Sequence, residues 1–470
     1  MGSLRPSQFH VKAVAVIGAG PSGIAAARHL RSQGTFDRIV IFEQQHQVGG
    51  VWNYSPIAPG PYPVPQTNPF FPPDAPVSSP AQASPVFPSP MYEKLHANII
   101  KPLMQVPKLP FPADSWIFPS REDIQNYLIN SAREVRDLIH FDSRVTNVSL
   151  APGGGRDRWR IQAHSTVDER VIDGVFDAVV VANGHYSVPF IPDITNIASF
   201  HNAHPSIIIH SKQYRRAQAF KDKKVVVVGN GPSGADIALQ INQVSKGRTI
   251  LSVRTATPPG RLAFTGCEEV PEIEEFLVDQ RGVRFKNGRI ETNIDAVVFS
   301  TGYLFSFPFL PDLQTELVSD GRSVYGLYKH LFHIRHPTLA FASLLVKVIP
   351  LHVAEAQAAA IAAVWSGNLD LPPTQEMERW RSELEATCTD HSKLLMAGDG
   401  YINELHEWVM QADHVGTPPP WWDDETFWQR SQLMDAKLRF EQRDLRPTTF
   451  EELGFRYNPE TTIERTASES

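Results

Sequence analysis

The chain has 470 residues, 42% of them hydrophobic, so it can bury the cores of two or three folding units. Its net charge of −7 and its lack of any block rich in lysine and arginine argue against nucleic acid or an anionic membrane surface as a partner. Two cysteines, Cys267 and Cys388, are too few for a disulfide framework or a cysteine-rich metal site, and they favour a reducing, cytoplasmic location.

The N-terminal region predicts a strand, a glycine turn, a helix and a second strand. Apolar residues 13–17 and 39–42 favour the two strands, and residues 24–30 favour a helix that stops at Gly34. The turn between the first strand and the helix reads GAGPSG. We therefore expect a βαβ unit at the start of the chain.

Residues 54–90 are dense in proline, which argues against a long helix or a central strand. We expect a surface insertion here. It is either a variable loop or a lid over a substrate site.

From residue 141 onward the chain carries three short β patterns, FDSRVTNVSL, RWRIQAHST and FDAVVVANG. The first two are joined by the turn-rich stretch APGGGRD. This order predicts an antiparallel meander that returns to a parallel sheet.

A second βαβ unit is predicted from Lys224, with a helix that stops near Gly247 and the strand TILSVR after it. The stretch DAVVFSTGY at 295–303 favours another buried strand. The rest of the chain alternates a strand in PTLAFASLL with helices at 354–365, near 376–389 and near 402–411. Charged residues and a proline interrupt the most apolar segment, which begins at Thr338, so it predicts a core strand and helix rather than a membrane span.

Both βαβ units carry a GxGxxG pattern that follows an apolar strand and opens a helix, an arrangement typical of dinucleotide-binding sites. The first glycine allows the tight turn, the second lets a phosphate approach the backbone, and the third lets the helix pack on the strand. The predicted cofactor-binding residues are Gly18, Gly20, Pro21, Ser22 and Gly23 in the first loop and Gly229, Gly231, Pro232, Ser233 and Gly234 in the second.

The residue about 20 positions after the last glycine distinguishes the two ligands, because it lies beside the adenosine ribose. In the first unit this residue is Glu43, followed by Gln44, and a carboxylate there suits the ribose hydroxyls of FAD or NAD. In the second unit it is Arg254, followed by Thr255, and a guanidinium suits the 2′-phosphate of NADP(H). Two sites of different preference imply that a hydride passes from NADPH to FAD.

The chain resembles the class B flavin-containing monooxygenases over nearly its whole length. QVGGVW is similar to the GGxW motif of that family, and MYEKLHANIIKPLM at 91–104 is similar to YxxLxTNxPKxxM, with Ala97 in place of the threonine. FPSREDIQNYL resembles the FPSR segment, and FSTGY resembles ATGY. The resemblance implies that Gly50, Val51 and Trp52 lie along the FAD.

The motif FxGxxxHxxxY that identifies this family is only half present. His210 and Tyr214 keep its final spacing, but His204 and Ser206 stand where phenylalanine and glycine belong. Baeyer–Villiger relatives end the motif in Trp-Pro, whereas this chain has Tyr214-Arg215, so ketone-to-ester chemistry is the weaker alternative.

The fold that these features predict is α/β, with two nested Rossmann-like units as in glutathione reductase and an antiparallel meander. Residues 1–200 and 304–470 are expected to form a discontinuous FAD-binding domain, into which an NADP(H)-binding domain of residues 201–303 is inserted. The resemblance adds these cofactor-binding candidates: Arg121, Val145, Ser211, Tyr214, Thr301 and Gly302.

The resemblance also implies the chemistry. NADPH reduces FAD, O₂ adds to the reduced flavin, and the C4a-hydroperoxide oxygenates a soft nucleophile of a small molecule, with sulfur favoured over nitrogen. Asn98 is the expected catalytic residue beside the flavin, because its amide both donates and accepts hydrogen bonds.

Other readings of the sequence stay open. A disulfide reductase needs a cysteine pair, and a redox sensor would bind both nucleotides without turnover. The histidines near 201–210 and 330–336 lack carboxylate or cysteine partners at ligand spacing, so we expect no metal site, and His185 is expected to be a hydrogen-bonded loop histidine. Homo-oligomerisation is left open.

Overall fold

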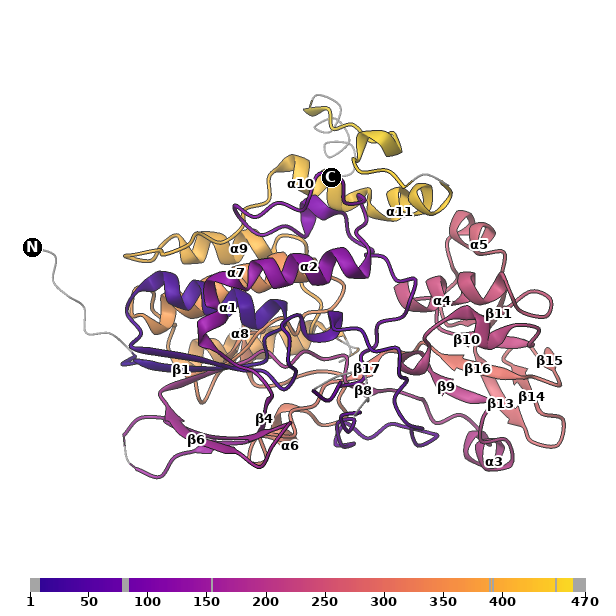
Figure 1. Ribbon diagram of the computed structural model, residues 1–470, viewed down its shortest axis with the longest axis horizontal. Helices are drawn as coiled ribbons and strands as arrows, with labels where there is room; N and C mark the ends of the chain where they lie inside the picture. The colour runs from indigo at the N-terminus through magenta and orange to yellow at the C-terminus, as the bar shows by residue number, and fades with distance from the viewer. Residues whose placement is uncertain are drawn as a thin grey trace, which may run out of the picture.

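Two β-sheets, one mostly and one wholly parallel, organise the chain, and most helices pack around the larger one (Figure 1). The computed structural model describes residues 9–77, 84–153, 155–388, 390, 393–443 and 446–459. Part of the proline-rich insertion expected at 54–90, residues 78–83, therefore lies outside the described residues.

The larger sheet has seven strands in the order β18-β19-β20-β7-β1-β2-β3. Five of them run parallel, and β18 and β19 form an antiparallel edge. The bounds are β1 (Ala13–Ile17), β2 (Arg38–Phe42), β3 (Ile139–His140), β7 (Ala178–Val181), β18 (Leu327–Tyr328), β19 (Phe332–His333) and β20 (Leu339–Phe341).

The two faces of this sheet are buried against different layers. Val14 and Val16 of β1 face helices α1 (Pro21–Gln33) and α7 (Pro350–Trp365), which pack on one another. Ala15 and Ile17 point to the opposite face, as the period of a strand requires, and join the cluster that contains the meander. Fifteen of the sixteen residues of α7 are buried, which confirms that its apolar sequence belongs to a core helix.

The smaller sheet has five parallel strands in the order β12-β11-β10-β16-β9. Its helix α4 (Pro232–Asn242) ends earlier than predicted, because Asn242 donates to the carbonyl of Thr265 and accepts from the N–H of Thr249, which turns the chain before Gly247. The bounds are β9 (Ile208–His210), β10 (Val225–Val228), β11 (Ile250–Val253), β12 (Glu268–Pro271), β16 (Ala296–Phe299) and α5 (Pro259–Thr265), with β13 (Ile273–Leu277), β14 (Gly282–Phe285), β15 (Ile290–Glu291) and α3 (Ile197–Ala203) beside them.

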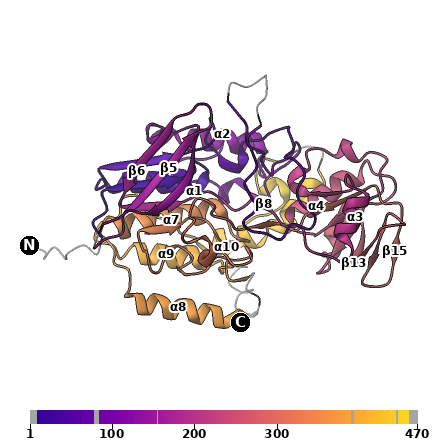
Figure 2. The same cartoon turned by 90° about the horizontal axis from the view of Figure 1, so that it is seen from below.

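The antiparallel meander is confirmed, and so is the return of the chain through FDAVVVANG to the parallel sheet, where this stretch supplies β7. The meander consists of β4 (Ser143–Leu150), β5 (Trp159–Ser165) and β6 (Val171–Phe176), and its third strand, β6, is not predicted from the sequence. β6 is mostly solvent-facing, so its short sequence lacks the apolar run that marks a buried strand. Figure 2 shows β5 and β6 on one side of the molecule and α7, α9 and α8 on the other.

The chain passes between the two sheets twice, and the two passages pair with each other. β8 (Val188–Pro189) leads out of the larger sheet and β17 (Tyr303–Leu304) leads back, and they are antiparallel neighbours between the two halves in Figure 1. The remaining helices are α2 (Arg121–Ser131), α6 (Gln314–Leu317), α8 (Thr374–Thr387), α9 (Tyr401–Val409), α10 (Asp424–Ser431) and α11 (Leu433–Glu441). Short 3-10 turns are η1 (Gly50–Trp52), η2 (Lys101–Leu103), η3 (Arg133–Leu138), η4 (Ser211–Gln213), η5 (Ala217–Phe220) and η7 (Glu451–Leu453). Within the described ranges, every helix is too short or too polar to cross a membrane.

Candidate active site

The first glycine loop joins β1 to α1 and can only be built from glycine at two positions. Gly18 has φ +102°, and a Cβ on it would lie 2.6 Å from the carbonyl oxygen of Ala182. A Cβ on Gly23 would lie 1.9 Å from the carbonyl oxygen of Gly18. Gly20 precedes the helix, and no described side chain caps it, so the first N–H groups of α1 are open to an anion.

A second glycine pair folds back onto this loop. The N–H of Gly49 donates to Ala19 at 2.9 Å, and a Cβ on Gly50 would lie 3.1 Å from the Cα of Gly20. The two backbones thus form a narrow cradle that side chains would fill. The sequence prediction missed Gly49, whose φ of +118° lies in the region that favours glycine and whose Cα faces the side-chain amide of Gln125.

Glu43 lies at the carboxyl end of β2 beside this cradle and is buried. Its two carboxylate oxygens accept hydrogen bonds from the N–H groups of Ala19, at 2.7 Å, and Gln45, at 2.8 Å. Burial raises the pKa of the Glu43 carboxyl to about 7, and those N–H groups act against the rise because they favour the ionised form. Gln44 follows it, half-buried.

Two polar groups near the cradle lack partners. The Nε of Arg121 and the Oε1 of Gln125 are buried without a hydrogen bond to any described residue. The sequence leaves open whether Arg121 binds a phosphate or pairs with a carboxylate, and its Nη2 forms an ion pair with Glu122. The Arg121 guanidinium lies 4.0 Å from the ring centre of Tyr54, and the Gln125 amide donates to Val48 at 2.8 Å. A dinucleotide would fit here, since buried polar groups are otherwise hydrogen-bonded.

Val51 and Trp52 continue the same segment as the turn η1. Both are half-buried, and the carbonyl of Val51 accepts a hydrogen bond from the hydroxyl of Ser89.

The second glycine loop, between β10 and α4, repeats the construction. Gly229 has φ +100°, and a Cβ on it would lie 2.8 Å from the carbonyl oxygen of Ser300. A Cβ on Gly234 would lie 2.0 Å from Gly229, whereas one on Gly231 would meet no atom within 4 Å. Pro232 and Ser233 begin the helix, exposed and uncapped by described side chains, so its N–H groups face open space.

Arg254 does not occupy the position that corresponds to Glu43. The N–H of Gly229 donates to the carbonyl of Ser252, just as the N–H of Gly18 donates to the carbonyl of Phe42. In the second unit, Val253 is therefore the equivalent of Glu43, and Arg254 lies one residue further along the chain. The carboxylate that would repel a 2′-phosphate is therefore replaced by a valine.

Arg254 and Thr255 are exposed, and no described residue forms an ion pair with Arg254. The carbonyl of Thr255 accepts a hydrogen bond of 2.8 Å from the side chain of Asn230, a loop residue that the sequence prediction missed. This hydrogen bond joins the second glycine loop to the end of β11, and the exposed guanidinium of Arg254 lies next to Thr255 in the chain.

Asn98 lies in the segment that runs between the two units. The segment is held by hydrogen bonds from Ala97 to Pro119, at 2.9 Å, and from Lys101 to Ile117, at 2.8 Å. Asn98 itself is exposed, and its amide has no hydrogen bond to the described part of the chain. Both its donor and its acceptor are available.

Other predicted cofactor residues take structural positions. Tyr214 is fully buried and donates to Gln240 at 3.0 Å, and Val145 lies in the core beneath the meander. Ser211 is also buried. Thr301 donates to the carbonyl of Phe190, and Gly302 accepts from His210 at 3.0 Å, so both connect the crossing between the sheets.

The prediction that His185 is a hydrogen-bonded loop histidine is wrong. Both of its ring nitrogens are buried and lack partners among the described residues. The ring lies 4.4 Å from that of Tyr186 and 5.1 Å from that of Phe305, and burial lowers the pKa of His185 to about 4. The imidazole is neutral at pH 7, and it follows β7 at the same edge as Gly18.

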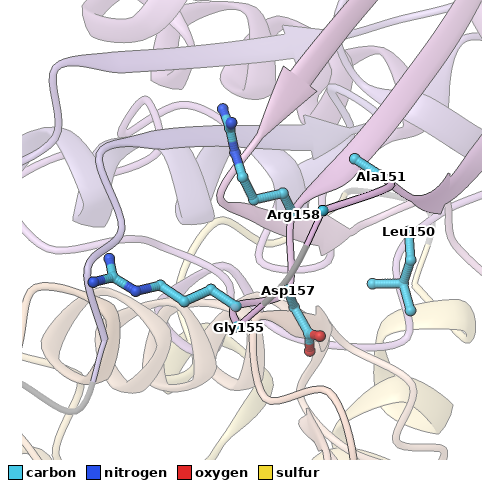
Figure 3. Close-up of a pocket in the computed structure, with 7 residues that line it drawn as sticks. Leu150, Ala151, Gly155, Asp157 and Arg158 are labelled. Atoms are coloured by element: carbon cyan, nitrogen blue, oxygen red, sulfur yellow. The ribbon is translucent and has the colours of Figure 1, made fainter.

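Two surface hollows lie away from the glycine loops. One of about 430 Å³ is lined by residues of the β4–β5 turn, and in Figure 3 Asp157 and Arg158 point in different directions. The other, of about 570 Å³, is lined by charged residues that include Lys224, Arg289 and Glu291, and both cations form ion pairs with Glu291. Among the residues that the structure describes, no group of histidine, cysteine and carboxylate side chains is placed to hold a metal ion, and Cys267 and Cys388 are both free.

Comparison with known proteins identifies relatives over most of the chain. Residues 88–258 and 259–416 match the family described as flavin-binding monooxygenase-like, and residues 16–70 match an NAD(P)-binding Rossmann-like domain. A flavin-containing monooxygenase of Arabidopsis thaliana, FMO GS-OX-like 2, is 33% identical over 413 residues, which are 85% of this chain and 82% of that protein.

Two further relatives are named for sulfur chemistry. The thiol-specific monooxygenase of Saccharomyces cerevisiae is 32% identical over 381 residues, 77% of this chain and 79% of that protein. The solved structure of S-allyl-L-cysteine S-oxygenase from Allium sativum superimposes with a TM-score of 0.75 and 26% identity, over 97% of this chain and 98% of that one.

Proposed function

The chain belongs to the flavin-binding monooxygenase-like family, and from this premise we propose that it oxygenates the sulfur atom of a small thiol or thioether. It is a flavin monooxygenase that binds FAD and NADP(H) and takes O₂ and a small molecule as substrates. The observation that carries the choice of sulfur is that similar proteins covering most of this chain are named as a thiol-specific monooxygenase and an S-oxygenase.

We assign FAD to the first glycine loop and NADP(H) to the second. Gly18, Gly20 and Gly23 with the open N-terminus of α1 would receive the pyrophosphate of FAD, and Glu43 would accept hydrogen bonds from its ribose. Arg254 would pair with the 2′-phosphate of NADP(H) at the other loop. The FAD-binding domain would comprise residues 1–200 and 304–470, and the inserted NADP(H)-binding domain residues 201–303.

Bound FAD, once reduced by NADPH, supplies an oxygen atom derived from O₂. For a thioether the balance is NADPH, a proton, O₂ and the thioether giving NADP⁺, water and the sulfoxide. The side chains of this chain bind and orient the reactants. Asn98 offers an amide that can donate and accept a hydrogen bond beside them.

A substrate panel tests this proposal. The FAD-loaded chain is supplied with NADPH and, in turn, a cysteine thioether, a small thiol, a tertiary amine and a cyclic ketone, and products are identified by mass spectrometry. We expect kcat/KM for the sulfur compounds to exceed the others. Preference for the amine would contradict the sulfur assignment, and preference for the ketone would indicate Baeyer–Villiger chemistry.

A further inference from the structure

The segment that carries Asn98 is attached to both halves of the molecule. At its start, the N–H of Glu93 donates to the carbonyl of Arg215 at 3.0 Å, and Arg215 lies on the path into the smaller sheet. At its end, Ala97 and Lys101 are bonded to residues 117–119, next to α2. The ammonium of Lys437 on α11 also donates to the carbonyl of Ala97 at 2.9 Å.

Tyr92 joins this segment to helix α4. Its ring is 3% exposed, and its hydroxyl donates to the carboxylate of Asp236. Asp236 lies in the second turn of α4, two residues after Gly234, the last glycine of the second glycine loop. The hydroxyl of Tyr92 therefore connects α4, the helix after the second glycine loop, to the segment that carries Asn98.

A closed network surrounds this bond. Gln240, one turn further along α4, donates to Asp236 at 3.2 Å and accepts from the hydroxyl of Tyr214 at 3.0 Å. The rings of Tyr92 and Tyr214 lie edge to face with their centres 5.3 Å apart. Each polar group of the network has a partner, so removing one hydroxyl leaves a buried acceptor short of a donor.

Electrostatics keep the hydroxyl in the donor role. Burial raises the pKa of Tyr92 well above that of a free tyrosine, and the carboxylate of Asp236 adds to the rise. Burial also raises the pKa of Asp236, while the Tyr92 hydroxyl and the charge of Lys437 act against it; Glu441 lies on the same side, and Arg261 on α5 faces Asp236.

We propose that Tyr92 is a positioning residue, which couples occupation of the second nucleotide site to the placement of Asn98 through its hydrogen bond with Asp236. A dinucleotide bound at the start of α4 orders the first turns of that helix, and Asp236 belongs to them. Tyr92 transmits this order to residues 91–101. The inference rests on the proposed assignment of NADP(H) to the second loop.

Hydrogen–deuterium exchange on the FAD-loaded, oxidised full chain tests the coupling without catalysis. In the wild type, NADP⁺ is expected to slow amide exchange both in residues 229–242 and in residues 92–101. In Tyr92→Phe the slowing in 229–242 stays, and in 92–101 it falls by about tenfold, the loss expected for a hydrogen bond to a charged acceptor. Product formed per NADPH consumed falls in the same variant, with KM for NADPH unchanged.

Three comparisons make the result decisive. Asp236→Asn keeps an acceptor for the hydroxyl and should retain most of the slowing. Tyr401→Phe removes another buried tyrosine hydroxyl, which donates to Lys329 at 2.8 Å, and should leave the slowing unchanged. If Tyr92→Phe does not fold, Asp236→Ala breaks the same bond from the other side and is expected to lose the slowing.

Slowing in 92–101 that persists in Tyr92→Phe, or in Asp236→Ala, would overturn the coupling. Wild-type slowing confined to 229–242 would do the same and leave the cofactor assignment intact. If NADP⁺ slows neither region, the assignment of NADP(H) to the second loop fails together with the coupling. The choice of sulfur is tested separately by the substrate panel.

Discussion

Replacing Asp74 by alanine is expected to lower the free energy of unfolding by about 3–5 kcal/mol, because it strips a buried ammonium of its counter-charge. The Lys212 side chain is 2% exposed, and its ammonium donates to Asp74 and to the carbonyl of Ser187, each at 2.5 Å. The hydroxyl of Tyr62 donates to the same carboxylate at 3.0 Å. Of the two acceptors of the Lys212 ammonium, only the carbonyl of Ser187 would remain in the variant.

The pH dependence of this loss has a definite sign. Burial lowers the pKa of Lys212, and the charge of Asp74 acts against that, so removing Asp74 lowers the pKa further. A folded state with a lowered lysine pKa binds fewer protons than the unfolded chain. The destabilisation of Asp74→Ala should therefore shrink as the pH rises towards the ordinary lysine value of 10.5.

Urea titration of the FAD-loaded chain, followed by far-UV circular dichroism, measures the effect. Asp168→Ala is the matched control, because the side chains of its ion pair with Arg170 are 45% and 76% exposed and solvent screens such a pair, so its loss should change stability little. The double variant Asp74→Ala with Lys212→Met should recover most of the loss, since it removes both charges. An Asp74→Ala variant no less stable than Asp168→Ala would refute the reasoning.

Four residues carry the remaining predictions. Gly231→Ala should fold and retain FAD, since its Cβ meets no atom of the protein, but it should bind NADPH more weakly. Gly234→Ala should fail to fold, because its Cβ would lie 2.0 Å from the carbonyl oxygen of Gly229. Soluble yield and flavin absorbance distinguish the two variants. Arg254→Ala should raise the Kd of NADPH by about 10- to 100-fold, through loss of a charge-assisted contact, and leave NADH unaffected in equilibrium titrations; an equal loss for both nucleotides would contradict the assignment. The pKa of Glu43 is raised from 4.5 to about 7, so its contribution to stability is full below 4.5 and is lost as the pH rises through 7. The FAD-free chain should lose about 3 kcal/mol of stability over that window, and Glu43→Gln should abolish the dependence in urea titrations at several pH values.

The sequence was most informative where local rules decide the structure. Both glycine loops follow from turn geometry, and Gly18 and Gly229 have the positive φ that the pattern requires. The buried helix α7 follows from its composition. The helix end near Gly247 was misplaced because the side chain of Asn242, which no periodicity reveals, turns the chain earlier.

Features that depend on distant residues were not predictable. The sequence alone does not distinguish a loop from a lid in the proline-rich insertion. In the structure, its described part is attached to the crossing between the sheets by the ion pair of Asp74 with Lys212 and by the pairing of Gln66 with Ile191. The offset of Arg254 by one residue from the position equivalent to Glu43 can be seen only from the strand register. The lack of hydrogen-bond partners at His185 could not be predicted either, because it depends on which distant residues surround the ring.

Oxygen-isotope labelling tests the central claim most directly. The FAD-loaded chain is given NADPH and a cysteine thioether under ¹⁸O₂, and the sulfoxide and the consumed NADPH are quantified together. The assigned chemistry predicts one ¹⁸O atom in each sulfoxide and one sulfoxide for each NADPH. Unlabelled sulfoxide, or NADPH oxidised with only hydrogen peroxide formed, would contradict it.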